Sequence, residues 1–352
     1  MPSDTIINSI TNASISEIKV GVIIPTYNRP AYLKQAILSV LLQSHKNSIV
    51  YVMDDGGFSS TINILNDLND SRINFITNSE QLGLAKNITK GVNLLPDDIK
   101  WCMVVCDDDY IAPDFIELML DSIVNRGIKN IIHSQIVFVD EFNKIMRNGL
   151  DAPEEESAYD FVSARANFKR DRYLTGIMFS RDKFNQIGGY PDFKTGMAAD
   201  DALIFALAIQ DNLFFEGKAI SYIRIHNGAE SCQIIGIDKH FEAISQYGNY
   251  CKEIASKYCK AGSKTTELDR HVKALNIQLW NQALNSVKKN KELWHYEKTI
   301  YRIGLNPDLK FSIRIRISSF LGLYAFCPEK IGLYRSIWKR IGKVSSLINN
   351  SK

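Results

Sequence analysis

The chain has 352 residues, of which 45% are hydrophobic and 23% charged, as in an ordinary globular protein with room for one large domain and a smaller one. Its net charge of +3 is too small to indicate nucleic acid binding. Residues 1–17 are polar and lack the apolar core of a signal peptide, and no run of about 18 apolar residues predicts a membrane span.

Strand-like and helix-like runs alternate from residue 18 to about residue 140. Apolar, β-branched runs predict strands at Val20–Ile24, Ile49–Met53, Ile73–Ile76, Trp101–Cys106 and Ile131–Val139. Between them, apolar residues at helical spacing predict helices at Ala31–Ser44, Ser59–Leu68, Leu84–Leu95 and Pro113–Val124. This alternation predicts an α/β fold with a mostly parallel, doubly wound sheet flanked by helices.

The alternation weakens after residue 140. Residues 143–159 are polar and acidic and are predicted to form a loop. The elements expected next are a strand at Gly176–Ser180, a helical turn at Arg181–Gln186, a helix at Ala199–Gln210 and short strands at Leu213–Phe215 and Ala219–Ile225. From about residue 236 the pattern is helical. We therefore expect a polar lead-in (1–17), one α/β domain (18–235, with halves 18–140 and 141–235) and a helical, basic C-terminal region (236–352).

Polar side chains follow three of the predicted strands. They are Thr26-Tyr27-Asn28, Asp54-Asp55 and Asp107-Asp108-Asp109. In parallel sheets, ligands bind beyond the carboxyl ends of the strands. Three adjacent carboxylates after a buried strand repel one another and resist desolvation, and a hard dication such as Mg²⁺ or Mn²⁺ relieves this. The sequence therefore predicts a metal site that can hold a diphosphate, although a solvated acidic turn stays an alternative.

Six segments in a fixed order resemble a known family. They are Val22–Arg29, Val52–Gly56, Cys106–Asp109 with Pro113-Asp114, Ile187–Tyr190, Ala199–Ala202 and Tyr222–His226. Together they resemble the inverting family-2 glycosyltransferases, which have the GT-A fold. The resemblance covers residues 18–235, and the C-terminal region from residue 236 carries no segment that resembles the family.

The resemblance implies a role for each candidate site residue. Nucleotide-sugar binding is implied for Thr26, Tyr27, Asp55, Lys86, Asp107 and Asp108, metal binding for Asp109 and His226, general base catalysis for Asp201, and orientation of the acceptor for Asp200. Whether Asp108 or Asp109 is the main metal ligand stays open. A carboxylate base is needed because an acceptor hydroxyl is a poor nucleophile until its proton is removed.

Each of these residues also has a structural interpretation. Asp54-Asp55-Gly56 is a common turn sequence. Asp200-Asp201 suits the first turn of a helix, where acidic side chains are favourable. His226 at a strand end is compatible with a purely structural role, and Lys86 with an exposed lysine in place of the family's arginine.

The function implied by the resemblance is metal-assisted transfer of a sugar, with inversion, from a UDP-sugar to a carbohydrate hydroxyl, with Mn²⁺ or Mg²⁺ as cofactor. Two alternatives are a sugar nucleotidyltransferase and a catalytically inactive, glycan-binding scaffold on the same fold. The first needs a glycine-rich loop after the first strand, and Pro25–Pro30 contains no glycine. The second predicts loss of the carboxylates, all of which are present.

Basic residues are concentrated near the C-terminus. Residues 305–352 contain nine Lys or Arg and two acidic residues, interleaved with apolar ones. Such a segment either lies on an anionic membrane surface or packs on the rest of the chain with a solvated basic face. Six cysteines without a CxxC pair indicate reduced thiols and a cytoplasmic protein. The family resemblance, together with the basic segment, implies contact with the inner membrane face and a lipid-linked surface polysaccharide as acceptor, with packing of the segment on the chain as the alternative.

Overall fold

The structure, a computed structural model, describes residues 14–56, 58–167, 169–194, 196–226, 237–258 and 268–269, without the side chains of 58–60 and 237–244. The chain divides into two compact units, residues 1–235 with 239–276 and residues 236–238 with 277–352. The account below concerns the first unit.

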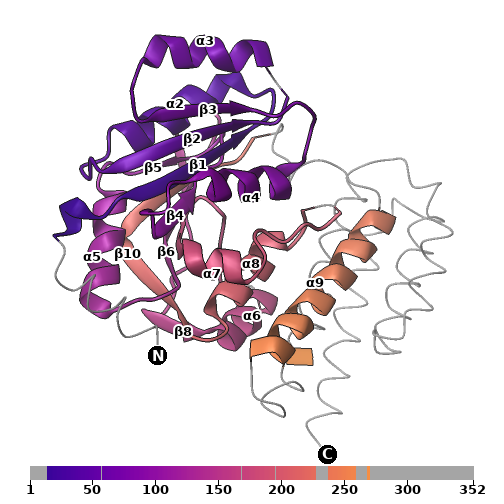
Figure 1. The fold of residues 1–352 in the computed structure, drawn as a ribbon. Coiled ribbons are helices and arrows are strands. Elements are labelled where there is room, and N and C mark those ends of the chain that lie inside the picture. The colour runs from indigo at the N-terminus through magenta and orange to yellow at the C-terminus, as the bar shows by residue number, and fades with distance from the viewer. Residues whose placement is uncertain are drawn as a thin grey trace, which may run out of the picture. The chain divides into compact units, whose positions relative to one another are not determined.

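The N-terminal half of this unit is a set of parallel strands connected by helices (Figure 1). In chain order its elements are η1 (Ile15–Glu17), β1 (Val20–Thr26), α2 (Pro30–Leu41), β2 (Ser48–Asp54), α3 (Phe58–Leu68), β3 (Ile73–Thr77), α4 (Leu84–Leu94) and β4 (Trp101–Val104). The strands lie in the order β3-β2-β1-β4, with every pair parallel. The predicted strands and helices of this half are confirmed, with shifts of a few residues at their ends.

The C-terminal half extends the same sheet with strands of both directions. Its elements are β5 (Tyr110–Ile111), α5 (Phe115–Arg126), β6 (Ile131–Val139), β7 (Ile145–Asn148), β8 (Glu155–Ser157), α6 (Ala158–Ala166), β9 (Ile177–Ser180), α7 (Arg181–Gln186), α8 (Ala199–Ala208), β10 (Asn212–Arg224) and α9 (Ile237–Tyr258). The order continues β4-β9-β6-β10-β5, where β6 and β10 are parallel and β9 is antiparallel to both its neighbours.

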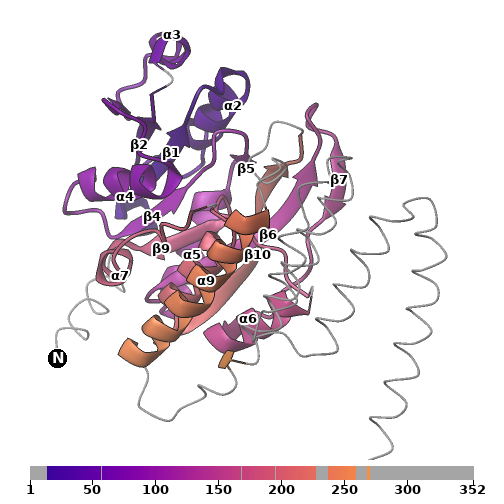
Figure 2. The same ribbon diagram turned by 90° about the vertical axis from the view of Figure 1, so that its right-hand side faces the viewer.

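Helices cover both faces of the sheet (Figure 2). On one face, Val22 and Ile24 of β1 share a buried apolar cluster with Leu33 of α2 and Phe115 of α5. On the other face α4 approaches β1 so closely that a Cβ at Gly91 would lie 2.9 Å from the Ile23 side chain. Alternating β1 side chains therefore enter two separate cores, as expected for a strand in the middle of a sheet.

Two sequence-based expectations are wrong. The segment 143–159 is not a loop, because β7 pairs with β6, β8 pairs with β10, and α6 begins at Ala158. The two short strands expected at 213–225 are one strand, β10, whose pairing with β6 is irregular between Glu216 and Ile220. Neighbouring strands satisfy the backbone groups of these polar segments, which the side-chain pattern does not reveal.

The α/β fold with a mostly parallel sheet is confirmed, whereas the domain limits 18–235 and 236–352 stay predictions. Among the described helices, none has both the length and the apolar character required to cross a bilayer. The basic segment 305–352 lies outside the described residues.

Candidate active site

The carboxyl ends of β1, β2 and β4 meet at one edge of the sheet. Thr26 at the end of β1 is in register with Asp54 at the end of β2, and Ile23 with Val104 at the end of β4. Asp55 and Asp107–Asp109 therefore follow strands that end side by side. The sheet topology brings together the polar clusters that the sequence predicted at these ends.

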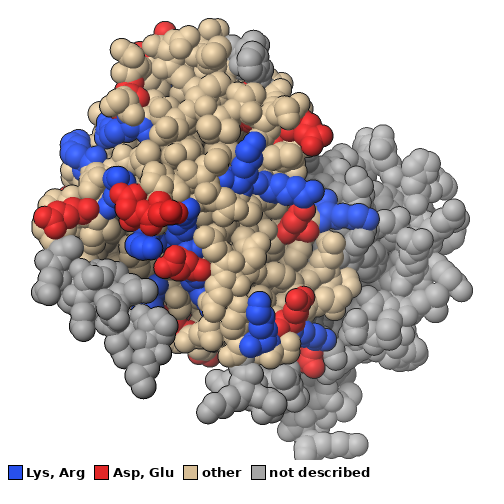
Figure 3. Space-filling view, in the orientation of Figure 1, with Lys and Arg blue, Asp and Glu red and all other residues tan. Residues whose placement is uncertain are grey.

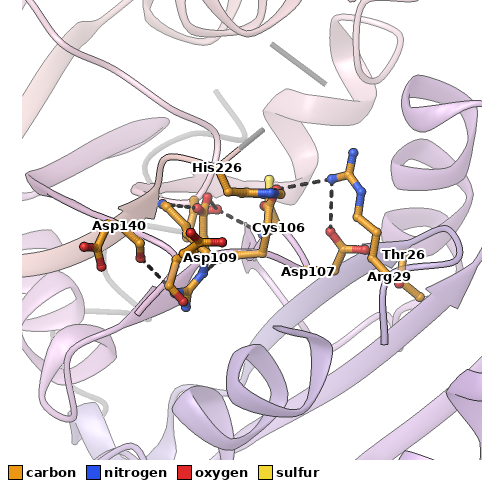
Figure 4. Close-up of polar contacts among 11 residues, drawn as sticks. Thr26, Arg29, Cys106, Asp107, Asp109, Asp140 and His226 are labelled. Carbon is orange, nitrogen blue, oxygen red and sulfur yellow. Dashed lines mark hydrogen bonds and ion pairs between the residues drawn. The ribbon is translucent and has the colours of Figure 1, made fainter. Parts of the chain in front are cut away.

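Asp107 is buried against β1. Its Oδ2 accepts a hydrogen bond from the Thr26 hydroxyl at 2.8 Å, and the Arg29 guanidinium lies 3.6 Å from its Oδ1 (Figure 4). Burial, followed by repulsion from Asp108, raises the pKa of Asp107 to about 6. The Asp107 carboxylate is thus held in a place where its charge is poorly solvated.

Asp108 lies between two cationic or potentially cationic groups. Its Oδ2 is 3.2 Å from Arg29 Nη1 and 3.1 Å from His226 Nε2. The His226 ring also lies 5.1 Å from the ring of Tyr32 in α2. The structure therefore brings the predicted residue His226 to the aspartate cluster, where its direct contact is with Asp108.

Asp109 is buried and held from two sides. The Thr175 hydroxyl donates to its Oδ2 at 2.6 Å, and the backbone N–H of Arg224 donates to its Oδ1 at 3.0 Å. Burial and the nearby Asp108 raise the pKa of Asp109 well above its usual value. Two hydrogen bonds therefore fix the orientation of the Asp109 carboxylate. Among the described residues, no ion pair joins Asp109 to a cationic side chain.

Arg224 connects this cluster to α2 and to the loop after β6. Its guanidinium donates to the backbone carbonyls of Asp108 and Asp140 and to the Gln35 side chain, and lies 4.5 Å from the centre of the Tyr32 ring. The sequence analysis assigned no role to Arg224, Arg29 or Thr175. The first two stand inside segments that carry the family resemblance, whereas no local signal marks Thr175.

The donor atoms at this edge fit a hard dication. Ligand atoms of Cys106, Asp108 and Asp109 lie within 4.8 Å of one another. Burial, followed by the charges of Asp109 and Asp108, raises the pKa of Cys106 well above its usual value. Its sulfur is also a soft donor, which suits a hard dication less well than carboxylate oxygen does. The carboxylates of Asp108 and Asp109 are consequently the suitable donors, and carboxylate oxygen is what Mg²⁺ and Mn²⁺ prefer.

Thr175→Val is expected to weaken Mn²⁺ binding by about 10- to 100-fold, since groups that orient a ligating carboxylate contribute on this scale. The variant keeps the shape of the side chain and removes the bond that the hydroxyl donates to Asp109, together with the bond that it accepts from the Cys106 backbone N–H. Calorimetric titration with Mn²⁺ measures the effect. The matched control is Ser134→Ala. It removes a buried hydroxyl that is hydrogen-bonded to the Ser221 hydroxyl of the neighbouring strand. Equal affinities for both variants would contradict the prediction.

Asp55 is bound to the loop that precedes α4. Its oxygens accept hydrogen bonds from the backbone N–H groups of Leu82 and Gly83 and from the Asn78 side chain, each at 2.8 Å. An ionised carboxylate offers about four acceptor positions, so one remains for a ligand. Tyr27, half exposed, follows the end of β1, and its ring lies near Gly56, the residue after Asp55.

Lys86 projects from α4 into solvent and lies 3.9 Å from Asp192. Both residues line a pocket of about 500 Å³ between α4 and the loop 188–192, together with Tyr190. At the N-terminus of α4, the backbone N–H of Gly83 donates a hydrogen bond to Asp55. The predicted nucleotide-binding residues thus occupy adjoining segments, with Lys86 the most exposed of them.

Asp200 and Asp201 lie in the first turn of α8 and are paired with two arginines. Arg172 bridges both carboxylates, with Nη1 3.0 Å from Asp200 and Nη2 2.8 Å from Asp201, while Arg165 Nε lies 2.7 Å from Asp201. Asp200 also accepts a hydrogen bond from the Tyr190 hydroxyl. The sequence predicted the two aspartates as site residues but gave no sign of their arginine partners.

The chain is similar in sequence to known glycosyltransferases and in fold to a solved structure. The model of glycosyl transferase family 2 matches residues 21–188. Glycosyltransferase GlyA of Streptococcus pneumoniae is 23% identical over 225 residues, which are 60% of this chain and 31% of that protein. Glucosyl-dolichyl phosphate glucuronosyltransferase of Haloferax volcanii is 27% identical over 196 residues, 52% of this chain and 58% of that protein. The chain thus spans less than two thirds of each of these relatives.

Among solved structures, TarS of S. aureus (residues 1–349, in complex with UDP-GlcNAc) superposes with a TM-score of 0.63 at 14% identity, covering 93% of this chain and 92% of that one. At this level of identity the likeness concerns the fold.

Proposed function

We propose that the protein transfers a sugar from a nucleoside diphosphate sugar to a hydroxyl of a carbohydrate acceptor, because residues 21–188 match the model of glycosyl transferase family 2. The observation that carries the proposal is the group of three carboxylates at the edge of the sheet, two of them buried with raised pKa values. Such a costly arrangement of like charges is expected where a dication and a diphosphate bind.

A UDP-sugar is the donor that this site suits. The TarS structure is described as a complex with UDP-GlcNAc, and it shares the fold of this chain. In the proposed pocket Tyr27 stacks on the base, Asp55 accepts a hydrogen bond from it, Thr26, Asp107 and Asp108 line the sugar and phosphate side, and Lys86 approaches the diphosphate. The remaining acceptor position of Asp55 supports this assignment.

The dication would be held by Asp109 and Asp108, with His226 beside them. When bound, it supplies positive charge next to the leaving diphosphate. Thr175 and the Arg224 backbone orient Asp109, while Arg29 holds Asp108 on the side that faces β1. The chain's own residues thereby place the donor, and the aspartate pair of α8 supplies the base for an inverting displacement.

The acceptor is proposed to be a growing surface glycan, carried on a lipid at the inner face of the membrane. On the face drawn in Figure 3, basic and acidic side chains of the described residues are interspersed and form no field of one sign. The proposed membrane contact rests on the basic composition of segment 305–352, and deleting that segment should weaken binding to anionic vesicles.

Calorimetric titration with UDP tests the proposed donor site. UDP is expected to bind in the presence of Mn²⁺ and to bind at least about tenfold more weakly after chelation with EDTA. A donor-hydrolysis screen over nucleotide sugars, with and without Mn²⁺, then identifies the sugar. Equal UDP affinity with and without the ion would contradict the metal assignment, and absence of UDP binding in both conditions would contradict the donor class.

Mn²⁺ is expected to raise the thermal stability of the protein more at about pH 7.5 than at about pH 5. The raised pKa of Asp107, about 6, means that the folded, ion-free chain binds more protons than the unfolded chain between roughly pH 4 and pH 6. Its stability therefore falls as the pH rises through that window. At about pH 5, which is below the raised pKa of Asp107, protons compete with the ion for the carboxylates. Melting temperatures with and without Mn²⁺ at both pH values provide the measurement, and equal shifts would contradict the prediction.

A further inference from the structure

Two asparagines and a lysine form a chain of hydrogen bonds that ends on Asp55. Asn78 follows β3, while Asn87 and Lys90 lie in α4. The Lys90 ammonium donates to Asn78 Oδ1 at 2.7 Å. Asn78 Nδ2 donates to Asp55 Oδ1 and to Asn87 Oδ1, each at 2.8 Å. Both asparagines and Asp55 are buried, whereas Lys90 is exposed, so the chain runs from the surface of the protein to a buried carboxylate.

The neighbours of Asn78 determine the orientation of its amide group. Lys90 can only donate a hydrogen bond, so the amide oxygen faces the ammonium group. The amide nitrogen then faces Asp55 and Asn87, and both of its hydrogens are used. The opposite orientation would place the amide oxygen against an ionised carboxylate, which only accepts. One arrangement therefore satisfies the network, and it directs an N–H group at Asp55.

The contacts of Asp55 leave its unused acceptor position on one particular oxygen. Oδ1 receives two hydrogen bonds, from Asn78 and from the backbone N–H of Leu82, whereas Oδ2 receives one, from the backbone N–H of Gly83. Each carboxylate oxygen has about two lone pairs, so the unused position belongs to Oδ2. Among these three donors, Asn78 is the one whose contribution comes from a side chain, and a substitution can remove it.

We propose that Asn78, held by Lys90, is a positioning residue that fixes the Asp55 carboxylate and thereby makes the donor site selective for the nucleobase. The proposal rests on the proposed function, in which Asp55 accepts a hydrogen bond from the base. Uracil presents a ring N–H between two carbonyl groups, which suits a single free acceptor. Cytosine has an unprotonated ring nitrogen at that position, and its lone pair repels a carboxylate oxygen.

A fixed carboxylate is what converts this difference between the bases into selectivity. A carboxylate that can rotate is able to accept from the amino group of cytosine, which lies next to the ring nitrogen. In this structure three hydrogen bonds hold Asp55 in one orientation. The positive charge of Lys90 polarises the Asn78 amide and strengthens the bond that it donates. Without Asn78, two backbone donors remain and the carboxylate gains freedom to rotate.

Lys90 also lines the pocket that contains Lys86, so a direct contact with the diphosphate is the alternative role for its charge. UDP and CDP separate the two roles, because they share the ribose and the diphosphate and differ only in the base. A phosphate contact stabilises both nucleotides alike. Positioning of Asp55 changes the ratio of their affinities.

The test is calorimetric titration of the full chain with UDP and with CDP in the presence of Mn²⁺. We expect wild type to bind UDP at least about 30-fold more tightly than CDP, since a site built around one donor rejects a base that lacks it. In Asn78→Ala the affinity for UDP is expected to fall about tenfold or more, as for loss of a hydrogen bond to a charged group, while that for CDP stays within about threefold. In transfer assays the same variant should raise KM for the UDP-sugar about tenfold and keep kcat within about threefold.

Variants of α4 provide a second measurement and a control. Lys90→Met, at an exposed helix position, is expected to lower the ratio of UDP to CDP affinity at least about threefold, and Lys90→Arg, which keeps a charged donor, to hold it within about twofold. The matched control is Asn93→Ala. It removes an exposed amide from the same helix and the same pocket, and the ratio should stay within about twofold of wild type.

A folded Asn78→Ala that keeps the wild-type ratio of affinities would overturn the proposal. If Asn78→Ala does not fold, Lys90→Met decides, because an unchanged ratio or an equal loss for both nucleotides would overturn it. Wild type that binds UDP and CDP equally would also overturn it, by removing the contact between Asp55 and the base. Wild type that binds neither nucleotide would remove the proposed donor class itself, which distinguishes that failure from a wrong role for Asn78.

Discussion

Replacing Asp109 with asparagine is expected to lower kcat/KM for sugar transfer by at least about 1,000-fold, equivalent to about 4 kcal/mol of transition-state stabilisation. Asp109 is the most firmly oriented carboxylate of the cluster, with a hydrogen bond from Thr175 on one oxygen and from the Arg224 backbone on the other. Asparagine retains the shape but removes the charge, and its NH₂ group cannot accept either bond. Steady-state kinetics with a UDP-sugar and Mn²⁺ provide the measurement.

Asp114→Asn is the matched control for Asp109→Asn. Asp114 stands at the exposed start of α5, five residues from Asp109, and its side chain makes no capping hydrogen bond. The same loss of one charge at this neighbouring position, beyond β5, should change kcat/KM by less than about threefold. Similar losses in both variants would show that net charge near the site, and not the Asp109 ligand, is responsible.

Thermal unfolding distinguishes loss of the ion from loss of the fold. Removing the buried Asp109 charge relieves its desolvation and its repulsion from Asp108, which offsets the one hydrogen bond that asparagine cannot accept, so the ion-free variant should melt close to wild type. The additional stability that Mn²⁺ gives to wild type should be absent. A variant that melts far lower without any ion would assign Asp109 a structural role and contradict the metal assignment.

Local sequence patterns predicted β1 and β4 because every residue of these two strands is buried, so that each reads as a continuous apolar run. In the C-terminal half, the strand Ile131–Val139 and the helical turn Arg181–Gln186 also have the limits that the sequence indicates. The failures lie where strands are polar or interrupted. β7 is fully exposed, and β10 continues past Gly217 and Lys218 because its pairing with β6 resumes at Ile220.

The site was predictable in its carboxylates but not in their partners. Asp107–Asp109 and Asp55 follow strands, and parallel topology alone places them at one edge. Thr175 lies 66 residues from Asp109 and approaches it only because β9 inserts antiparallel between β4 and β6. Arg165 likewise reaches Asp201 from α6, a helix that begins inside the segment 143–159 that was expected to be a loop. The partners of these carboxylates are therefore a tertiary property.

Arg172→Met is expected to lower the free energy of unfolding by about 3 to 5 kcal/mol at pH near 7, because it leaves two adjacent carboxylates without their shared cation in a buried place. Arg172 is itself buried and pairs with Asp200 and Asp201 at 3.0 and 2.8 Å. Urea denaturation measures the change. The control is Lys19→Met, which removes an exposed pair with Asp98 at 2.8 Å and should cost less than about 1 kcal/mol.

The effect of Arg172→Met should depend on pH in one direction. In the wild-type protein the pKa of Asp201 is lowered, with burial opposing and the Arg165 and Arg172 charges prevailing. Its stabilising contribution is therefore complete above the unfolded-state pKa of about 4 and is lost as the pH falls through the lower, folded-state pKa. The difference between wild type and variant should be greatest near neutral pH and shrink below about pH 4. Arg172→Lys, with one ammonium in place of a fork, should fall between the two, since a single point charge cannot hold both carboxylates in their separate orientations.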